Sequence, residues 1–354
     1  MEKAVTWITS PCPQKDNSFK ANAAERQTQL TKPLGSLGEL ENIAIRIADI
    51  QQTDAPSAEK IAITIFAADH GVVEEGVSAF PQEVTAQMVM NFLQGGAAIS
   101  VLAKQLNAKL EVVDVGILTP LAKRSSLIIQ RAGAGTSNSA KQAAMTEEQL
   151  QSALQAGYDA VERSLADDAD LFIGGEMGIG NTTSAATLYS ALLGLTPEQA
   201  TGAGTGLDDD GIKHKITIIK QILEKHQACG DDTLAWLRCV GGFEIAALTG
   251  AYIRAAQRGL PIIVDGFITT SAALCAILIQ PKVKDVLFFS HISAEQGHKN
   301  VMQILQQKPL LDLGMRLGEG SGAAVAANIV QSACRLHTQM ATFAEAAVAT
   351  QTDK

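Results

Sequence analysis

The sequence contains few aromatic residues and no basic patch. Aromatic side chains make up only 4% of the 354 residues, and no basic run with interleaved aromatics occurs. Because the formal net charge is −9, the chain lacks the positive surface with which proteins bind nucleic acids, and we exclude nucleic acid as a partner. The scarcity of aromatics predicts a core built from Ala, Ile, Leu and Val.

Cysteine is also scarce, and long apolar runs are missing. The five cysteines are scattered, without a CxxC pair or a histidine cluster beside them, so we expect reduced thiols and no metal site. The first residues lack a basic stretch followed by an apolar core, which argues against a signal peptide. Since no segment offers the roughly 20 unbroken apolar residues that cross a bilayer, we expect a soluble cytoplasmic protein without a membrane partner.

Short apolar runs alternate with helical stretches beyond residue 60, which is typical of a parallel α/β sheet. The predicted strands are 61–67, 110–115, 169–173, 237–240, 261–264 and 286–289. The predicted covering helices are 83–104, 146–165, 212–227, 244–258 and 269–279, and a last long helix follows residue 322. Residues 1–57 show helical spacing, and 51–60 reads as a linker.

Reactive polar residues follow several of the predicted strands. They are Asp69, His70, Glu176, Asp265, Ser290 and His291. Glycines end strands because turns need them, which explains part of this pattern but not the recurrence of acids and histidines. Open α/β sheets bind their ligands at the carboxyl ends of the strands, so we expect a site there.

The segment 171–187, LFIGGEMGIGNTTSAAT, is a strand that breaks into glycines before a helix begins. The loop glycines Gly178 and Gly180, with Asn181 and Thr182 at the helix start, would leave backbone N–H groups free at the positive end of the helix. This arrangement is either an anion site or only a tight strand-to-helix turn. Glu176, inside the same loop, either caps the helix or takes part in chemistry.

A second glycine-rich loop, 201–211, precedes a helix that carries Lys213 and Lys215. Its amides, with one lysine as a point charge, could hold a phosphate or a sugar. The contrary interpretation is a polar loop with solvated lysines, which the three consecutive aspartates 208–210 favour.

Glu319 lies among glycines in Gly-Glu-Gly-Ser-Gly, just before the last helix. Its carboxylate either caps that helix or acts as a general base, and spacing alone slightly favours the cap. For His70, a structural hydrogen bond is the better interpretation than a metal ligand, because no further ligand is close in sequence.

Several common catalytic motifs are missing. The sequence has no G-x-S-x-G elbow, and the stretch SHISAEQGH around His291 is not H-E-x-x-H. The glycine loops match neither G-x-G-x-x-G nor a P-loop. The stretch 76–88, with Ser78, Phe80 and Gln87, could present a hydroxyl, a ring and an amide to a flat apolar ligand.

Seven collinear motifs together resemble the nicotinate-nucleotide–dimethylbenzimidazole phosphoribosyltransferase family. They are KPLGSLG (32–38), DHGV through VSAFP (69–81), GEMGIGNTT (175–183), GTGLDD (204–209), VDGF (264–267), SH (290–291) and GEGSG (318–322). The match runs from about residue 30 to 330 without large gaps.

The resemblance implies transfer of the 5-phosphoribosyl group from nicotinate mononucleotide to 5,6-dimethylbenzimidazole with inversion at C1′. The products are α-ribazole 5′-phosphate and nicotinate, a step of cobalamin synthesis. It also implies a Rossmann-like six-stranded parallel sheet (58–310), a small helical domain made from both chain ends (1–57 and 311–354), a homodimer, and no metal or cofactor.

The resemblance also implies roles for individual residues. Glu319 would be the general base, and Glu176 would lie by the ribose and phosphate. Ser78, Phe80 and Gln87 would border the azole. The phosphate would be bound by Gly178, Gly180, Asn181, Thr182, Gly204, Thr205, Gly206 and Lys215.

Two places depart from the family pattern. Ala203 stands where many members carry arginine, and the spacing in 131–139 is unusual. Two other functions stay open on the residues alone. One is another nucleotide or phosphosugar enzyme on a doubly wound sheet, such as a dehydrogenase, and the other is a non-catalytic nucleotide- or azole-binding module in which both glutamates are helix caps.

Overall fold

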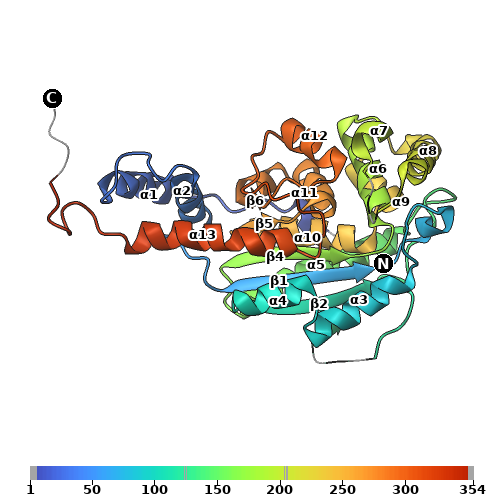
Figure 1. Ribbon diagram of the computed structural model, residues 1–354, viewed down its shortest axis with the longest axis horizontal. Helices are drawn as coiled ribbons and strands as arrows, with labels where there is room; N and C mark the ends of the chain where they lie inside the picture. The colour runs from blue at the N-terminus through green and yellow to red at the C-terminus, as the bar shows by residue number, and fades with distance from the viewer. Residues whose placement is uncertain (1–5, 123, 125, 203, 205, 350–354) are drawn as a thin grey trace.

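A parallel six-stranded sheet forms the centre of the computed structural model, which describes residues 6–349 except 123, 125, 203 and 205 (Figure 1). The strands are β1 (Ile61–Ala68), β2 (Lys109–Gly116), β3 (Leu127–Ile129), β4 (Leu171–Met177), β5 (Ile262–Val264) and β6 (Leu287–Phe289). Their order is β3-β2-β1-β4-β5-β6. This is the order of a doubly wound fold, in which the winding reverses between β1 and β4 and leaves a crevice at their carboxyl ends. The predicted α/β fold class is confirmed.

The strands β1, β5 and β6 are buried on both faces, as their apolar sequences require. All eight residues of β1 are buried, and the strand reads as a continuous apolar run rather than as alternation. The register pairs Phe66 of β1 with Glu176 of β4 and Val264 of β5 with Phe289 of β6. The residues that follow these strands are thereby brought to one edge of the sheet.

Helices cover both faces of the sheet. On one face lie α5 (Glu147–Ala166), α10 (Phe243–Arg258) and α11 (Phe267–Ile279), and on the other lie α3 (Glu83–Gln94), α4 (Ala98–Gln105) and α13 (Ser321–Gln339). Helices α5 and α10 pack so closely at their crossing that a Cβ at Gly157 would overlap the carbonyl of Ala247. The remaining α-helices are α6 (Asn181–Leu193), α7 (Pro197–Ala200), α8 (Asp209–Lys225), α9 (Thr233–Val240) and α12 (Gln296–Leu305).

The two chain ends meet beside the sheet. Helices α1 (Asn17–Gln29) and α2 (Glu39–Gln51) pack together, and the C-terminal half of α13 runs from the sheet to them (Figure 1). The Arg26 side chain donates to the carbonyls of His337, Thr338 and Met340 at the end of α13. This arrangement agrees with the expected helical unit from both termini, although the division at residues 58 and 310 stays a prediction.

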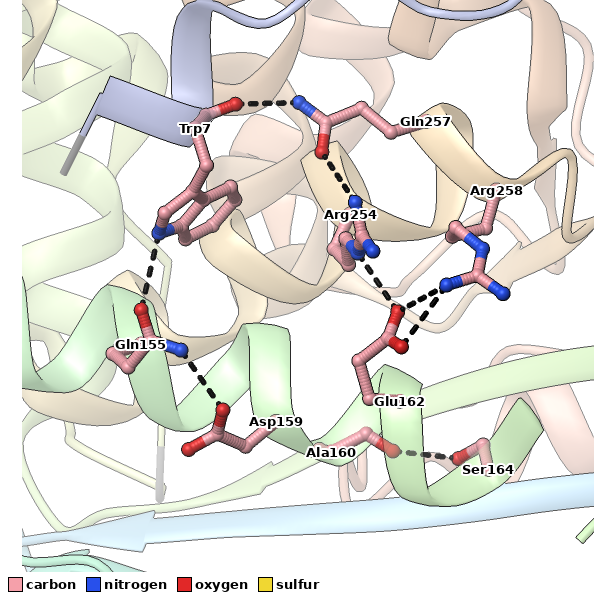
Figure 2. Close-up of polar contacts among 9 residues, drawn as sticks. All are labelled: Trp7, Gln155, Asp159, Ala160, Glu162, Ser164, Arg254, Gln257 and Arg258. Atoms are coloured by element: carbon pink, nitrogen blue, oxygen red, sulfur yellow. Dashed lines mark hydrogen bonds and ion pairs between the residues drawn. The ribbon is translucent and has the colours of Figure 1, made fainter. Parts of the chain in front are cut away.

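The first helical turn, η1 (Thr6–Thr9), lies against α5 and α10 (Figure 2). Trp7 donates from its indole nitrogen to Gln155 of α5 at 3.1 Å, and Gln257 of α10 donates to the Trp7 carbonyl at 2.6 Å. The Trp7 and Tyr158 rings lie 4.9 Å apart. The start of the described chain is therefore fixed on the outer helices of the sheet.

Two secondary-structure predictions were wrong. Residues 237–240 form the end of α9 rather than a strand, because the Asp232 carboxylate caps the N–H groups of Leu234 and Ala235 and a short apolar run fits either structure. The sixth strand is instead β3, which has only three residues at the sheet edge. The single helix predicted over 83–104 is two helices, because Gly95 adopts φ 83° and ends α3.

The break at Gly95 between α3 and α4 also bears on whether this stretch could span a membrane. The stretch Glu83–Gln105 is, by length and composition, apolar enough to cross a bilayer, and it is the one such candidate among the described residues. Its two helices are 12 and 8 residues long, shorter than the roughly 20 residues that a spanning helix needs. All five cysteines are free thiols.

Candidate active site

A cavity of about 400 Å³ opens at the carboxyl ends of β4, β5 and β6. Nine residues predicted for the site line it: Phe80, Glu176, Gly178, Asn181, Thr182, Gly204, Asp265, His291 and Glu319. They come from segments spread over 240 residues, which the parallel sheet brings to one edge. Thr205 lies outside the described residues.

Glu319 is held in an unusual backbone conformation. Gly318, Glu319 and Gly320 have φ values of 87°, 63° and 82°, so the glutamate occupies the left-handed region between two glycines. Non-glycine residues rarely adopt this conformation, and such strain is concentrated at functional sites.

The carboxylate of Glu319 is buried at the cavity wall. Burial raises its pKa, and a hydrogen bond from the backbone of Ile99 at the start of α4 partly offsets this effect. Its Oε2 atom has no hydrogen-bond partner among the described residues. Helix α13 begins at Ser321 with Gly320 as its N-cap, so Glu319 does not cap the helix that follows it. One carboxylate oxygen is left free to act on a ligand.

Asp265 fixes the loop that carries Glu319. Its two carboxylate oxygens accept from the N–H groups of Gly320 at 3.1 Å and Ala323 at 2.8 Å, at the positive end of α13. Burial raises the pKa of Asp265 to about 7, against the effect of these hydrogen bonds. Asp265 is therefore the cap of α13.

Glu176 lies against the other side of the same loop. Its Oε1 accepts from the Glu319 N–H at 3.4 Å, and its Oε2 accepts from Asn181 Nδ2 at 2.5 Å. Burial, with the nearby charges of Glu244 and Asp265, raises the pKa of Glu176 to about 8. At neutral pH the side chain is mainly protonated, and it can donate one hydrogen bond into the cavity.

The first glycine loop packs against the buried His70 side chain. Gly180, with φ 96°, is the N-cap of α6, and a Cβ at Gly178 would lie 2.6 Å from the Ala68 carbonyl oxygen. His70 lies beneath this loop, with Nε2 2.7 Å from Glu244 and Nδ1 3.1 Å from Ser184. Both ring nitrogens have protein partners, as expected for a structural histidine.

A buried lysine lies behind the cavity wall. Lys215 is almost fully buried and is not part of the lining, but it donates to Oγ1 of the lining residue Thr182 at 2.7 Å, and burial lowers its pKa to about 8. A Cβ at Gly204 would lie 3.1 Å from its Nζ. Arg316 and Glu295 line the cavity beside Gly204: Arg316 Nη1 lies 3.5 Å from the Gly204 carbonyl oxygen, and the Gly204 N–H donates to Glu295 at 3.4 Å.

An apolar wall completes the cavity. Phe80, Val84 and Met88 line it from α3 and the preceding loop, and Leu317 belongs to the segment before Glu319. The lining does not include Ser78, whose Oγ accepts from the Phe80 N–H, and Gln87 is exposed. Neither residue is therefore part of this cavity wall, and their predicted contacts with the azole stay predictions.

Three further candidates, Ser290, Asp69 and Gly206, do not line the cavity. His291 lines it, and Ser290 links His291 Nδ1, at 2.9 Å, to the Asp265 carbonyl, at 2.5 Å. Asp69 lies at the end of β1 and accepts from the Leu118 N–H at 2.7 Å. Gly206 is exposed and does not line the cavity.

The sequence analysis missed Arg316, Glu295, Ser293 and Met88. Arg316 stands only three residues before Glu319, so its position next to the glycine motif could have indicated it. Glu295 and Ser293 were considered only as part of a possible metal motif. Met88 could have been found from its helical spacing with Val84.

Buried carboxylates, glycine loops and a buried lysine around one cavity, on a doubly wound sheet, define an enzyme of the α/β class that acts on a phosphorylated ligand. A family model described as a phosphoribosyltransferase matches residues 12–348. Nicotinate-nucleotide–dimethylbenzimidazole phosphoribosyltransferases from Pseudomonas putida (strain W619) and Pseudomonas fluorescens (strain SBW25) are 55% and 54% identical, over 97% of this chain and 98% of each relative.

Solved structures agree with this likeness. The crystal structure of the same enzyme from Thermus thermophilus is 42% identical, with a TM-score of 0.90, and covers 95% of this chain and 100% of its own. A second structure, of CobT from the same organism, is 44% identical with the same TM-score, over 94% and 99%. The chain belongs to the nicotinate-nucleotide–dimethylbenzimidazole phosphoribosyltransferase family, and the predicted resemblance is confirmed.

We expect Glu176→Gln to change how stability depends on pH. The pKa of Glu176 is about 8 in the fold against an ordinary value of 4.5. As pH rises above about 4.5, the unfolded chain loses this proton first, so the carboxyl increasingly destabilises the fold until about pH 8. Relative to the parent, the variant should gain about 2–4 kcal/mol in free energy of unfolding between pH 5 and 8.

Urea denaturation at each pH measures this difference. Glu198→Gln is the control, because Glu198 is exposed and paired with Lys220, and we expect it to follow the parent's pH dependence. A stability difference between Glu176→Gln and parent that is constant with pH would contradict the raised pKa.

Proposed function

We propose that the cavity binds nicotinate mononucleotide and 5,6-dimethylbenzimidazole and transfers the 5-phosphoribosyl group between them. The products are α-ribazole 5′-phosphate and nicotinate. The observation that carries this proposal is the set of charged groups around one cavity: the carboxyl groups of Glu176, Asp265 and Glu319 and the guanidinium of Arg316 line it, and the buried Lys215 lies directly behind Thr182. Nicotinate mononucleotide has groups that such a site can bind, an anionic phosphate and a cationic pyridinium ring.

The phosphate would bind where Thr182, Lys215 and Arg316 lie around the Gly204 backbone. Thr182 stands at the start of α6, where N–H groups and the helix dipole favour an anion. Lys215 and Arg316 supply positive charge beside the Gly204 backbone. Arg316 thus offers a guanidinium at the loop whose residue 203 is alanine where many relatives carry arginine.

The azole would lie against the apolar wall of Phe80, Val84, Met88 and Leu317. A flat bicyclic ring is held there by burial of apolar surface, worth about 25 cal/mol per Å². The free carboxylate oxygen of Glu319 is then the acceptor for the azole N–H proton.

In the reaction, the C1′ bond to the nicotinate nitrogen breaks while the azole nitrogen bonds C1′ from the opposite face, which inverts the configuration. The other azole nitrogen loses its proton to Glu319. Nicotinate is already activated as a pyridinium, so orientation contributes most, roughly 7–11 kcal/mol. Proton transfer to a base of raised pKa adds about 10²–10⁴-fold in rate.

Protonated Glu176 and the Asp265 cap would hold the Glu319 loop and face the ribose as positive charge develops there. We also infer a homodimer, as expected for the family, with no metal or cofactor taking part. A non-catalytic module is the second reading, since the bond between Glu319 and Ile99 resembles a cap of α4.

Incubation of the protein with both substrates separates these functions. We expect the protein to release free nicotinate only when the azole is present. Chromatography measures this nicotinate and detects the second product, α-ribazole 5′-phosphate. Binding of both ligands without any nicotinate would establish the non-catalytic module instead.

Glu319→Gln should fold normally and bind nicotinate mononucleotide, yet lose about 10²–10⁴-fold in kcat, because the amide cannot take the azole proton. Steady-state kinetics measures kcat, and calorimetry measures nucleotide binding. Glu198→Gln serves as the control for a surface glutamate. Near-parental turnover of Glu319→Gln would show that another group is the base.

Lys215→Met should raise KM for nicotinate mononucleotide about 10-fold or more, because a charge-assisted hydrogen bond to phosphate is lost, while KM for the azole changes little. In the parent, nucleotide KM should rise above about pH 8 as Lys215 loses its proton. The exposed Lys213, on the same helix and paired with Asp210, gives the control variant Lys213→Met. Equal effects on both substrates would place the lysine away from the phosphate.

A further inference from the structure

The first turn of α3 carries a buried hydroxyl that joins two parts of the cavity. Thr85 is fully buried, and its Oγ1 accepts a hydrogen bond from the Ile179 N–H at 3.2 Å. Ile179 belongs to the loop between β4 and α6, which supplies the nucleotide end of the cavity. Helix α3 supplies Val84 and Met88 to the apolar wall. One hydrogen bond therefore links the two walls that would hold the two substrates.

A carboxylate lies beside the same hydroxyl. Burial raises the pKa of Asp69, which follows β1, and the neighbouring Thr85 hydroxyl and the Leu118 N–H, which donates to Asp69 at 2.7 Å, partly offset this effect. A hydroxyl has a single O–H donor and two acceptor lone pairs, so the Thr85 oxygen can accept from Ile179 while its O–H is directed elsewhere.

This chain of bonds sets the position of α3. Val84 and Met88 are four residues apart, so they share one face of the helix, and Thr85 lies beside that face, toward the sheet. The Gln82 side chain adds a second link at the same helix end, donating to the His70 carbonyl at 3.0 Å. The apolar wall is thus fixed to the end of β1 and to the nucleotide loop together.

Alignment of this kind matters for the transfer. The attacking nitrogen must approach C1′ in line with the leaving nicotinate, and a misplacement of about 1 Å can cost about 10²-fold in rate. Thr85 itself does not line the cavity. Any effect of this side chain on the reaction must act through Ile179 and α3.

We propose that Thr85 is a positioning residue for phosphoribosyl transfer, which fixes the acceptor wall of α3 against the nucleotide loop through its hydrogen bond with Ile179. This inference rests on the proposed function. The role of Thr85 is then to set a distance rather than to contact a substrate.

Thr85→Val removes the hydroxyl and keeps the branched shape. We expect kcat to fall about 10- to 100-fold, while the affinity for nicotinate mononucleotide alone, measured by calorimetry, changes less than about 3-fold. Thr85→Ser restores the hydroxyl and should keep kcat within about 3-fold of the parent. Thr249→Val is the matched control, since Thr249 is equally buried in α10 and bonds only backbone carbonyls.

Hydrogen exchange followed by mass spectrometry gives a readout that needs no activity. In Thr85→Val without substrates, the amide of Ile179 loses its acceptor, so a peptide covering 172–183 should exchange faster than in the parent or in Thr249→Val. If Thr85→Val does not fold, Thr85→Ala takes its place in both measurements.

Parental kcat in the folded Thr85→Val protein would overturn the inference, and so would unchanged exchange over 172–183. A loss of activity that Thr85→Ser fails to restore, or that only follows the folded fraction, would also overturn it. If the parent protein itself releases no nicotinate, the proposed function fails, and the exchange result still reports on the Thr85 link by itself.

Discussion

The site depends on one tether, the carboxylate of Asp265 against the first turn of α13. Asp265 directly follows β5, the strand next to the sheet edge formed by β6, and the two N–H groups from which it accepts belong to the N-cap and first turn of α13, near the end of the chain. The positive helix terminus favours the negative carboxylate. Together with the Glu176 carboxyl group, which accepts from the Glu319 N–H, this bond holds Gly318, Glu319 and Gly320 in three successive positive-φ conformations beside the cavity.

Burying three carboxyl groups at this site favours their protonated forms. Glu176, Asp265 and Glu319 lie close together in a buried place, where ionised carboxylates are poorly solvated and repel one another, and the pKa of each is raised. The same shifts bring carboxyl groups toward neutral pH, where a base can take and release a proton efficiently. Burial has the opposite effect on Lys215 behind the cavity wall, because it disfavours the charged form of a lysine and lowers its pKa to about 8.

In the α/β fold, a small number of hydrogen bonds and one long helix connect the loops of the site to the rest of the chain. The winding reverses between β1 and β4, and the loop after β4 therefore lies free to receive a ligand. Thr85 ties that loop to α3, and α13 continues from Glu319 to the paired helices α1 and α2. Helix α13 thus connects the Glu319 loop at the sheet edge to the helices at both chain ends. A movement of the expected small helical unit would therefore also move the Glu319 loop.

The sequence by itself determined the fold class, five of the six strands and the glycine motifs, because burial patterns and turn residues are local properties. It could not separate a strand from the end of α9 at 237–240, since Asp232 decides that segment by capping. It also left Glu319 between cap and base. Only the tertiary structure showed that Asp265, 54 residues earlier in the chain, caps α13 and that one oxygen of Glu319 has no protein partner, while the role of Glu319 as the base stays a proposal. The Thr85 link could not be read from the sequence, because it depends on Ile179, a neighbour that only the tertiary fold brings beside α3.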